Sequence, residues 1–229
     1  LQGTRPGRLV AYRCPAAGHE GGPRWSEDEH EVDRWCRLVT DAGGRCGRDD
    51  LRLPRLGSPH DCVVIHPGAA SASRRWPVDR WRSVAAALAV RGVPIVVTGT
   101  RDERATCAHV AGAHSGVRDL SGKLSLPALA DLVAGAPLLV SGDTGPAHLA
   151  TAYGTPSVLL FGPVPPDRWG PVIDPERHVV LWRPDVAAPH GGDPHGAALD
   201  SALAAITVDD VLGGIDAVLP SRLAPSRRS

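Results

Sequence analysis

Residues 141–156, SGDTGPAHLATAYGTP, decide the fold that this sequence predicts. An apolar run at 136–140 leads into the segment and a second one at 157–161 leaves it. Strand, tight turn, helix and strand in this order form the βαβ unit of a parallel sheet. Ligands of such sheets bind at the carboxyl ends of the strands. The turn at 143–145 lies at such an end, so we expect it to border a binding site.

The alternation continues on both sides of this segment. Short runs of β-branched and other apolar residues predict buried strands at 62–65, 93–98, 117–120, 136–140, 157–161 and 178–182. Helical spacing and end signals predict helices at 78–90, 102–113, 126–134 and 207–219. This order is typical of an α/β protein with a Rossmann-like, doubly wound parallel sheet.

The N-terminal part has a different pattern. A helix is expected over 26–42, capped by Ser26 and ended by two glycines, after a short strand at 9–12. Its expected buried face comprises Val32, Trp35, Cys36 and Val39. An Arg-, Pro- and Gly-rich connector follows. The predicted divisions are 1–60, then a domain over 61–219, then a mobile tail at 220–229.

Composition narrows the class of protein. The chain has 229 residues, 42% of them hydrophobic and 22% charged, with a net charge of zero. A neutral chain is a poor coat for nucleic acid, and no apolar run approaches the roughly 20 residues of a membrane helix. The five cysteines form no CxxC pair, so we expect neither a disulfide framework nor a zinc site, and a reducing compartment. A chain that begins at Leu1 and lacks methionine is expected to be a fragment or a processed product.

Small and hydroxyl-bearing residues recur where the predicted strands end. They are Gly68, Ala69, Ser71, Gly99, Thr100, Ser121, Gly122, Thr144 and Gly145. Backbone N–H groups at such turns, beside helix N-termini, can bind a phosphate or diphosphate. Each glycine alone can also be explained by turn geometry. No GxGxxG or GxxxxGK[ST] follows a strand, which disfavours dehydrogenases and P-loop enzymes.

Charged residues beside the first two turns have two interpretations each. Arg74 and Arg75 can hold a diphosphate through their forked donors, or form a solvated surface pair. Glu103 can accept both hydroxyls of a ribose, or serve as an acid at a helix N-terminus.

The opening segment carries three further candidates. Asp143 and Thr144 can bind sugar hydroxyls or cap the helix that Pro146 begins. His148 faces the same turn, where it could act on a ligand or be a structural hydrogen-bonder. Three other residues, His190, Asp193 and His195, have metal-like spacing in a loop that offers no further ligand, so no metal site is predicted.

Taken together, these pieces resemble glycosyltransferase family 9, the heptosyltransferase family. The resemblance implies a GT-B fold, in which two Rossmann-like domains face a cleft. It also implies a C-terminal domain that binds a nucleotide-sugar donor, typically ADP-heptose, and an N-terminal domain that binds the acceptor and supplies an acidic base. Transfer would invert the anomeric centre without a metal. The matching motifs are HPGA (66–69), RRWP (74–77), VVTG (96–99) with Glu103, DLSG (119–122), GDTGPAHLA (142–150) and LFGP (160–163).

The resemblance assigns roles to individual residues. Arg74 falls where the family usually has a lysine on the donor diphosphate, and Glu103 falls near its ribose-binding acid. Residues 1–60 then resemble the end of the acceptor domain with its linker, and the catalytic base is expected in the N-terminal part that is missing. The predicted donor-binding residues are Gly68, Ala69, Ser71, Arg74, Thr98, Gly99, Glu103, Asp143, Thr144, Gly145 and His148.

The predicted function is therefore an inverting, metal-independent transfer of a sugar, with heptose as the family default, to a cell-envelope glycan or glycolipid. No cofactor and no nucleic acid are expected. The expected location is cytoplasmic, with peripheral contact at the inner membrane face, and the fragment alone is expected to bind donor without transfer. The alternative is a non-catalytic nucleotide-sugar-binding module, which a start codon just before Leu1 would favour. A sugar-nucleotide epimerase is disfavoured, because the DTGPxH pattern is not typical of one.

Overall fold

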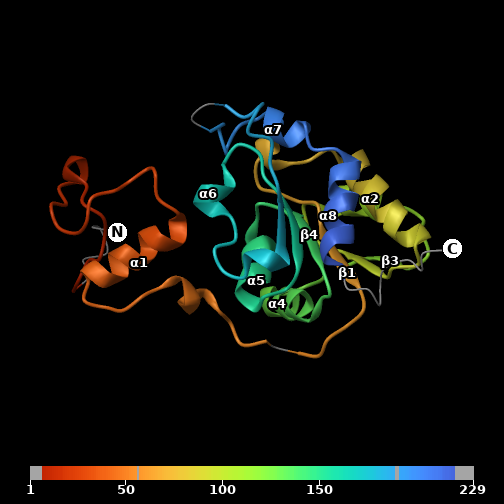
Figure 1. The fold of residues 1–229 in the computed structure, drawn as a ribbon, viewed down its shortest axis with the longest axis horizontal. Coiled ribbons are helices and arrows are strands. Elements are labelled where there is room, and N and C mark those ends of the chain that lie inside the picture. Colours follow the sequence, from red (N-terminus) through yellow and green to blue (C-terminus); the bar gives the residue numbers. More distant parts are fainter. Residues whose placement is uncertain (1–6, 56, 189–190, 220–229) are drawn as a thin grey trace. The chain divides into compact units, whose positions relative to one another are not determined.

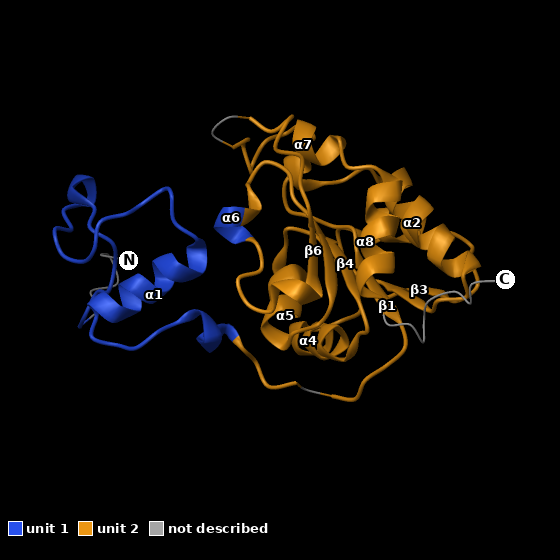
Figure 2. Ribbon diagram, viewed as in Figure 1, with its two compact units in different colours: residues 1–51, 167–169 blue, residues 52–166, 170–229 orange. Residues whose placement is uncertain are grey.

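The computed structural model describes residues 7–55, 57–188 and 191–219 (Figure 1). The chain splits into two compact units (Figure 2), one of residues 1–51 with 167–169 and one of residues 52–166 with 170–229. The predicted tail at 220–229 and the metal candidate His190 lie outside the described residues. The described helices include none that is long and apolar enough to cross a membrane.

The larger unit is built on one parallel sheet of six strands. The strands are β1 (Val63–His66), β2 (Ile95–Val97), β3 (Val117–Asp119), β4 (Leu139–Gly142), β5 (Ser157–Leu160) and β6 (His178–Leu181). Their order is β3-β2-β1-β4-β5-β6, and Val64 of β1 pairs with both Val96 and Leu139. The predicted Rossmann-like parallel sheet is confirmed, in the strand order of the dinucleotide-binding folds.

Helices cover both faces of this sheet. They are α2 (Val78–Val90), α3 (Arg104–Ala111), α4 (Leu126–Gly135), α5 (Gly145–Tyr153), α7 (Ser201–Ala204) and α8 (Val208–Val218). Val63 and Ile65 pack in one core with α2, α3 and α8, whereas Val64 packs in a second core with α4 and α5 (Figure 1). Successive strand residues point to opposite faces, so continuous apolar strands are what a sheet covered on both faces needs.

Two tryptophans fix the chain just after the β1 loop. The rings of Trp76 and Trp81 meet edge to face at 5.0 Å, with 3% and 1% of their surfaces exposed. The indole Nε1 of Trp76 donates to the Ile206 carbonyl at 3.0 Å. Burial of such large rings dominates core energetics. The anchored rings hold the neighbouring residues Arg74 and Arg75 in place at the edge of the sheet.

Among its described residues, the smaller unit contains the helix α1 (Glu31–Asp41), two 3₁₀ turns, Pro15–Ala17 and Arg48–Leu51, and residues 167–169 of the short helix α6 (Pro166–Trp169). The predicted start at Ser26 is wrong, because His30 caps the helix by accepting from the Val32 N–H. The predicted strand at 9–12 is also wrong, since those residues are irregular in the structure.

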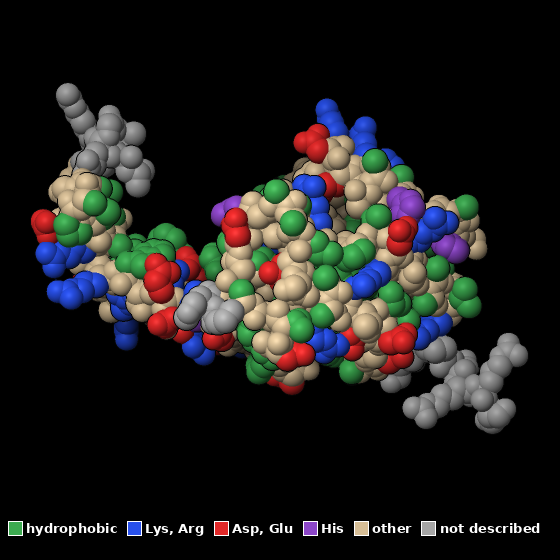
Figure 3. Space-filling model, turned by 90° about the horizontal axis from the view of Figure 1, so that it is seen from above, with side chains coloured by type: hydrophobic (Ala, Val, Ile, Leu, Met, Phe, Trp, Pro, Cys, Tyr) green, Lys and Arg blue, Asp and Glu red, His purple; other side chains and the backbone are tan. Residues whose placement is uncertain are grey.

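The predicted buried face of this helix is wrong as well. Arg34 and Leu38 are its buried residues, while Trp35 is 53% and Val39 41% exposed. The Arg34 guanidinium lies 4.1 Å from the Trp25 ring centroid and pairs with Glu31, so its burial is compensated. Hydrophobic side chains are accordingly visible on the surface of this unit in Figure 3.

A disulfide joins Cys36 to Cys46, which corrects the expectation that the cysteines are unpaired. The chain turns back after α1 at Gly43 and Gly44, where the Gly44 N–H donates to the Val39 carbonyl. This reversal brings the two Cα atoms to 4.8 Å across ten residues of sequence. Among the described residues, Cys14, Cys62 and Cys107 are free.

Candidate functional site

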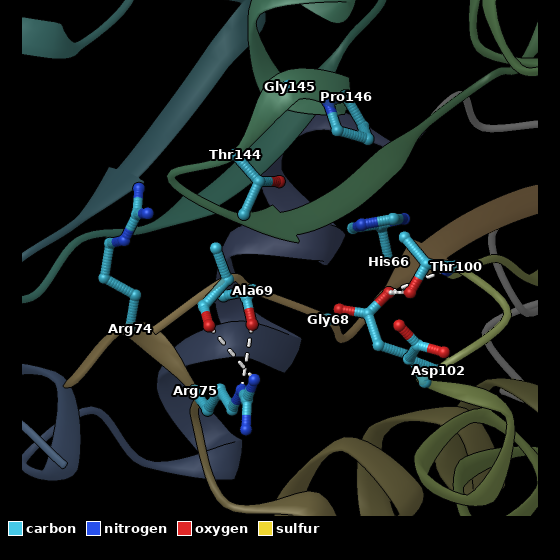
Figure 4. Close-up of a pocket in the computed structure, with 12 residues that line it drawn as sticks. His66, Gly68, Ala69, Arg74, Arg75, Thr100, Asp102, Thr144, Gly145 and Pro146 are labelled. Atoms are coloured by element: carbon cyan, nitrogen blue, oxygen red, sulfur yellow. Dashed lines mark hydrogen bonds between the residues drawn. The ribbon is translucent and has the colours of Figure 1, made fainter. Parts of the chain in front are cut away.

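The candidate site lies where the strand order changes direction. Sequence order runs outward from β1 to β3 on one side and from β4 to β6 on the other. The loops that follow β1 and β4 therefore diverge and leave a crevice, which is where ligands bind in such sheets. A cavity of about 420 Å³ opens there, lined by residues of the loops after β1, β2 and β4 (Figure 4).

One wall of this cavity depends on a close approach between Gly68 and Glu103. A Cβ added at Gly68 would lie 2.1 Å from Oε1 of Glu103, so a larger residue at this position would force the Glu103 carboxylate to move. The other oxygen, Oε2, accepts from the Thr100 N–H at 2.7 Å and from its hydroxyl at 2.9 Å. Glu103 thus fixes the turn before α3 through Thr100 and also lines the cavity, and its predicted role as a ribose-binding acid stays a prediction.

The two arginines after the β1 loop have different surroundings. Arg75 donates from Nε to the Ala69 carbonyl at 2.8 Å and from Nη2 to the Ala70 carbonyl at 3.1 Å (Figure 4). Arg74 makes one long contact, from Nη1 to the Asp143 carbonyl at 3.4 Å, and its Nε is buried without a hydrogen bond among the described residues. Both side chains line the cavity.

The opposite wall is the turn before α5. The hydroxyl of Thr144 lies 3.0 Å from that of Ser141, and the helix begins at Gly145 with Pro146 in its first turn. The backbone N–H groups of a first helical turn lack helical partners and favour an anion. Three of these residues, Thr144, Gly145 and Pro146, line the cavity.

Asp143 is a buried carboxylate beside His148 and Arg74. It is 9% exposed, and its Oδ1 lies 3.7 Å from Nε2 of His148. Burial raises the pKa of Asp143, while His148 and Arg74 lower it. Among the hydrogen bonds of the described residues, none from an α5 backbone N–H reaches this carboxylate, so capping does not explain its place.

A second cavity of about 360 Å³ adjoins the first and shares His66 and Thr100 with it. Nδ1 of His66 lies 2.9 Å from the Thr98 hydroxyl. Burial lowers the pKa of His66, and Glu103 raises it by a smaller amount. The far wall of this cavity contains Leu124, Leu126, Leu129 and Ser125, together with Arg101 and Gly122.

The structure brings most of the predicted site residues to these two cavities. Gly68, Ala69, Arg74, Glu103, Thr144 and Gly145 line the first, and Thr98 and Gly99 line the second. Ser71, Asp143 and His148 line neither, although Asp143 and His148 lie on the same turn. The leucines of the second cavity carry no sequence signal, because apolar residues at a helix start are typical of cores. Only the structure singles out Leu126, which is 72% exposed although it borders the cavity.

The metal candidates do not form a site among the described residues. The Asp193 carboxylate accepts from the His195 backbone N–H at 2.8 Å, which is a local turn contact. The described part of the chain contains no group of three or more His, Cys, Asp or Glu side chains that could hold a metal ion.

The sheet order and the crevice at its switch point define a Rossmann-like domain of the nucleotide-binding α/β class. The chain belongs to glycosyltransferase family 9 (heptosyltransferase), whose pattern residues 37–190 match. The predicted family, fold class and enzyme class are thereby confirmed at the level of the family.

Relatives and solved structures agree with this assignment. Lipopolysaccharide heptosyltransferase 3 of Escherichia coli is 30% identical over 173 residues, which is 74% of this chain and 50% of that protein. Lipopolysaccharide heptosyltransferase 1 of Pseudomonas aeruginosa is 34% identical over 124 residues, covering 54% of this chain and 34% of that protein. The structure of E. coli ADP-heptose LPS heptosyltransferase II matches with a TM-score of 0.60 at 25% identity, over 72% of this chain and 48% of that one.

The E. coli heptosyltransferase WaaC with ADP shares the fold, with a TM-score of 0.62 at 23% identity, over 84% of this chain and 58% of that one. The chain spans about half the length of the first curated relative that it matches, 50%.

Proposed function

We propose that residues 61–219 bind the nucleotide-sugar donor of a glycosyl transfer, with ADP-heptose as the first candidate. The observation that carries this is the pair of adjoining cavities at the switch point, one lined by arginines and one by leucines. A nucleotide sugar needs both environments, an apolar slot for the flat base and a cationic site for the diphosphate. The solved relatives include an enzyme named for ADP-heptose, which supports the choice of donor.

The orientation of the ligand follows from the chemistry of the walls. The base would occupy the cavity of Leu124, Leu126 and Leu129, and the ribose would meet Glu103 where the two cavities join. The diphosphate would then lie between Arg74 and the first turn of α5.

The sugar end of the donor would meet the turn before α5. The Asp143 carboxylate would accept from sugar hydroxyls, and the lack of a hydrogen bond from an α5 backbone N–H to it among the described residues supports this role. His148, 3.7 Å from that carboxylate, adds a cationic group when protonated. Thr144 and Gly145 belong to the same predicted donor set.

We propose that transfer inverts the anomeric centre and needs no metal. An acceptor hydroxyl attacks the anomeric carbon, the carbon–oxygen bond to the diphosphate breaks, and a base takes the hydroxyl proton. Charge builds up on the departing diphosphate, where Arg74 and the α5 N-terminus can stabilise it without a metal ion. The base would lie outside residues 61–219, so this domain without an acceptor-binding partner would bind donor and not transfer sugar. Unchanged transfer in excess EDTA is the expected result for the full-length enzyme.

The acceptor would be a glycan or glycolipid of the cell envelope, as the names of the lipopolysaccharide enzymes among the relatives suggest. Such an acceptor would place the protein in the cytoplasm, in peripheral contact with the inner membrane face. The Cys36–Cys46 bond argues against a reducing compartment, because disulfides are rare in cytosolic proteins. Alkylation of free thiols in cells, read by mass spectrometry, decides this point: modification of both cysteines supports the cytoplasm.

A thermal-shift screen of the chain against ADP-, UDP- and GDP-sugars tests donor binding. The preferred donor should raise the melting temperature. At 100 times its Kd, the free energy of unfolding should increase by about 2.7 kcal/mol. A chain indifferent to all three classes would contradict the proposal. A full-length protein that binds donor but neither hydrolyses nor transfers it, across several donors, would be the non-catalytic binding module.

Asp143→Ala is the matching variant. It should lower donor affinity about tenfold, the loss expected for a hydrogen bond to a charged group, and leave a cooperative melting transition. Loss of that transition would instead assign Asp143 a structural role.

A further inference from the structure

Adjacent arginines, Arg74 and Arg75, both line the first cavity, yet they differ in what their guanidinium groups contact. Arg74 is the last residue of the 3₁₀ turn Ala72–Arg74 and Arg75 follows it, and Figure 4 shows the two side chains pointing to different parts of the site. On charge alone, either could hold a diphosphate. Their hydrogen bonds separate them.

The Arg75 guanidinium forms two hydrogen bonds with the loop that precedes it in the chain. Nε and Nη2 of one guanidinium donate to the consecutive carbonyls of Ala69 and Ala70, at 2.8 and 3.1 Å. Two donors fixed in one plane match two neighbouring acceptors, a geometry that the single ammonium of lysine cannot reproduce. Since Ala69 is only 5% exposed, this contact fastens a buried part of the loop.

The hydrogen bonds of Arg75 also fix the direction in which the backbone carbonyl groups of the loop point. Carbonyl oxygens repel a phosphate, whereas backbone N–H groups attract one. Two carbonyls engaged by Arg75 are kept from turning toward the ligand. Loop residues Gly68 and Ala69 both line the cavity, so the shape of this loop is part of the binding surface.

Arg74 is in the opposite situation. Its Nη1 makes a long contact of 3.4 Å with the Asp143 carbonyl, and its Nε is buried without a hydrogen bond among the described residues. Such a group gains most from a ligand oxygen, because a buried unpaired donor is costly. Arg74 therefore has donors to offer where Arg75 has already used its own.

We propose that Arg75 is a positioning residue, which locks the loop at 67–71 in its binding shape and leaves the diphosphate to Arg74. This assignment rests on the proposed donor site. It predicts that substitution by lysine affects the two arginines differently. Arg74→Lys keeps a cation where only a cation is needed, whereas Arg75→Lys keeps the charge and loses the pair of donors in one plane.

Amide hydrogen exchange of the chain without ligand tests the loop directly. Arg75→Lys and Arg75→Gln should speed exchange about tenfold or more at the amides of residues 73–75, whose hydrogen bonds to Gly196, Ser71 and Ala72 close the turn after the loop, and Arg74→Lys should leave it unchanged. Melting curves confirm that each variant is folded before the comparison. Unchanged exchange in both Arg75 variants would overturn the proposal, whether or not the protein binds a nucleotide.

Calorimetry with ADP, UDP and GDP tests the different roles of Arg74 and Arg75. The titrations are repeated from 50 to 300 mM NaCl, which changes the Debye length about twofold. Arg75→Lys should weaken binding about tenfold with the salt dependence of the unmodified chain, while Arg74→Lys binds nearly as well as that chain. Arg74→Gln should flatten the salt dependence. If Arg75→Gln flattens it equally and Arg75→Lys binds normally, Arg75 contacts the phosphate and the proposal is wrong. Failure of the unmodified chain to bind any of the three would count against the donor site, and the exchange experiment would still judge Arg75.

Discussion

Each end of the sheet has a buried histidine paired with a hydroxyl side chain, but the surroundings of the two pairs differ. At the carboxyl end, His66 and Thr98 lie 2.9 Å apart, and at the amino end, His178 and Ser157 lie 2.8 Å apart. All four residues are buried, and burial lowers the pKa of both histidines. By residue type and local contact, the pairs are equivalent.

Position makes them different. His66 borders both cavities, whereas His178 borders neither, and its Nε2 is buried without a hydrogen bond among the described residues. A salt bridge of 2.6 Å between Arg52 and Asp174 braces the chain near His178. In a parallel sheet the carboxyl end holds the ligand loops and the amino end holds the fold together. We therefore expect the His66–Thr98 pair to affect ligand binding and the His178–Ser157 pair to affect only the stability of the fold.

The largest expected effect comes from filling the close approach at the carboxyl end. Gly68→Val would drive a side chain into the Glu103 carboxylate, which a Cβ alone would already meet at 2.1 Å. Glu103 must then give up its bonds to Thr100, and the wall of the cavity moves. We expect nucleotide affinity to fall about 100-fold, or about 2.8 kcal/mol, in calorimetry.

The control for this variant is Gly213→Ala in α8, where an added Cβ meets nothing within 4 Å. It should bind as the unmodified chain does. Normal nucleotide binding by Gly68→Val would show that the cavity does not hold the ligand, and the contrast between the two ends would lose its basis.

Ser157→Ala tests the amino end. It leaves Nδ1 of His178 without its partner, so stability should fall by about 1–2 kcal/mol, or roughly 3–6 °C in melting temperature. Nucleotide affinity should not change. The matched variant at the carboxyl end is Thr98→Val, which should lower both stability and affinity because Thr98 lines the second cavity. Equal effects of the two variants on binding would erase the distinction.

The sequence predicts the larger unit well, because its signals are local and consistent. Apolar strands lie between capped helices, such as α8, which Thr207 begins through a reciprocal capping box with Asp210. The turns after the strands could be assigned to one site because the carboxyl ends of parallel strands must meet. Six of the predicted donor residues line the first cavity for this reason.

What could not be predicted depends on contacts between distant or unusual partners. A helical pattern places apolar residues inside, but Arg34 is 6% exposed because Trp25 and Glu31 surround its head group. The Cys36–Cys46 bond needs a chain reversal that spacing alone does not reveal. The different tasks of Arg74 and Arg75 depend on which carbonyls lie within reach.

A smaller effect is expected at the apolar cavity of the carboxyl end. Leu126 is 72% exposed yet borders that cavity, so Leu126→Ala removes contact area for the base and little from the core. Affinity for ADP should drop about fivefold, or about 1 kcal/mol, with the melting temperature of the unliganded chain nearly unchanged. The control is Val90→Ala, also highly exposed at 85% and remote from both cavities. Indistinguishable affinities in the two variants would place the base elsewhere.

The smallest effect, a shift of stability with pH, comes from the two histidines together. Burial holds the pKa of His66 and of His178 below the usual value, near 6.5 in an unfolded chain. Between these values the unfolded state binds more protons, so unfolding becomes easier as the pH falls. The stabilisation is complete above about pH 6.5 and is lost progressively as the pH falls toward the folded pKa values.

Melting curves from pH 8 to pH 5.5 measure this loss, and His178→Gln and His66→Gln should each make the decline shallower. The two histidines should then separate when ADP is present. A nucleotide bound as proposed would cover the cavities that His66 lines and bring phosphate charge near it. The loss of stability in acid that is due to His66 should then change, while the loss due to His178 should not. Three charged groups act on His178: Asp174 and Glu176 raise its pKa, and Arg177 lowers it. These groups are the same with or without ligand. A decline that ADP alters equally in both variants would mean that the two ends of the sheet are not independent.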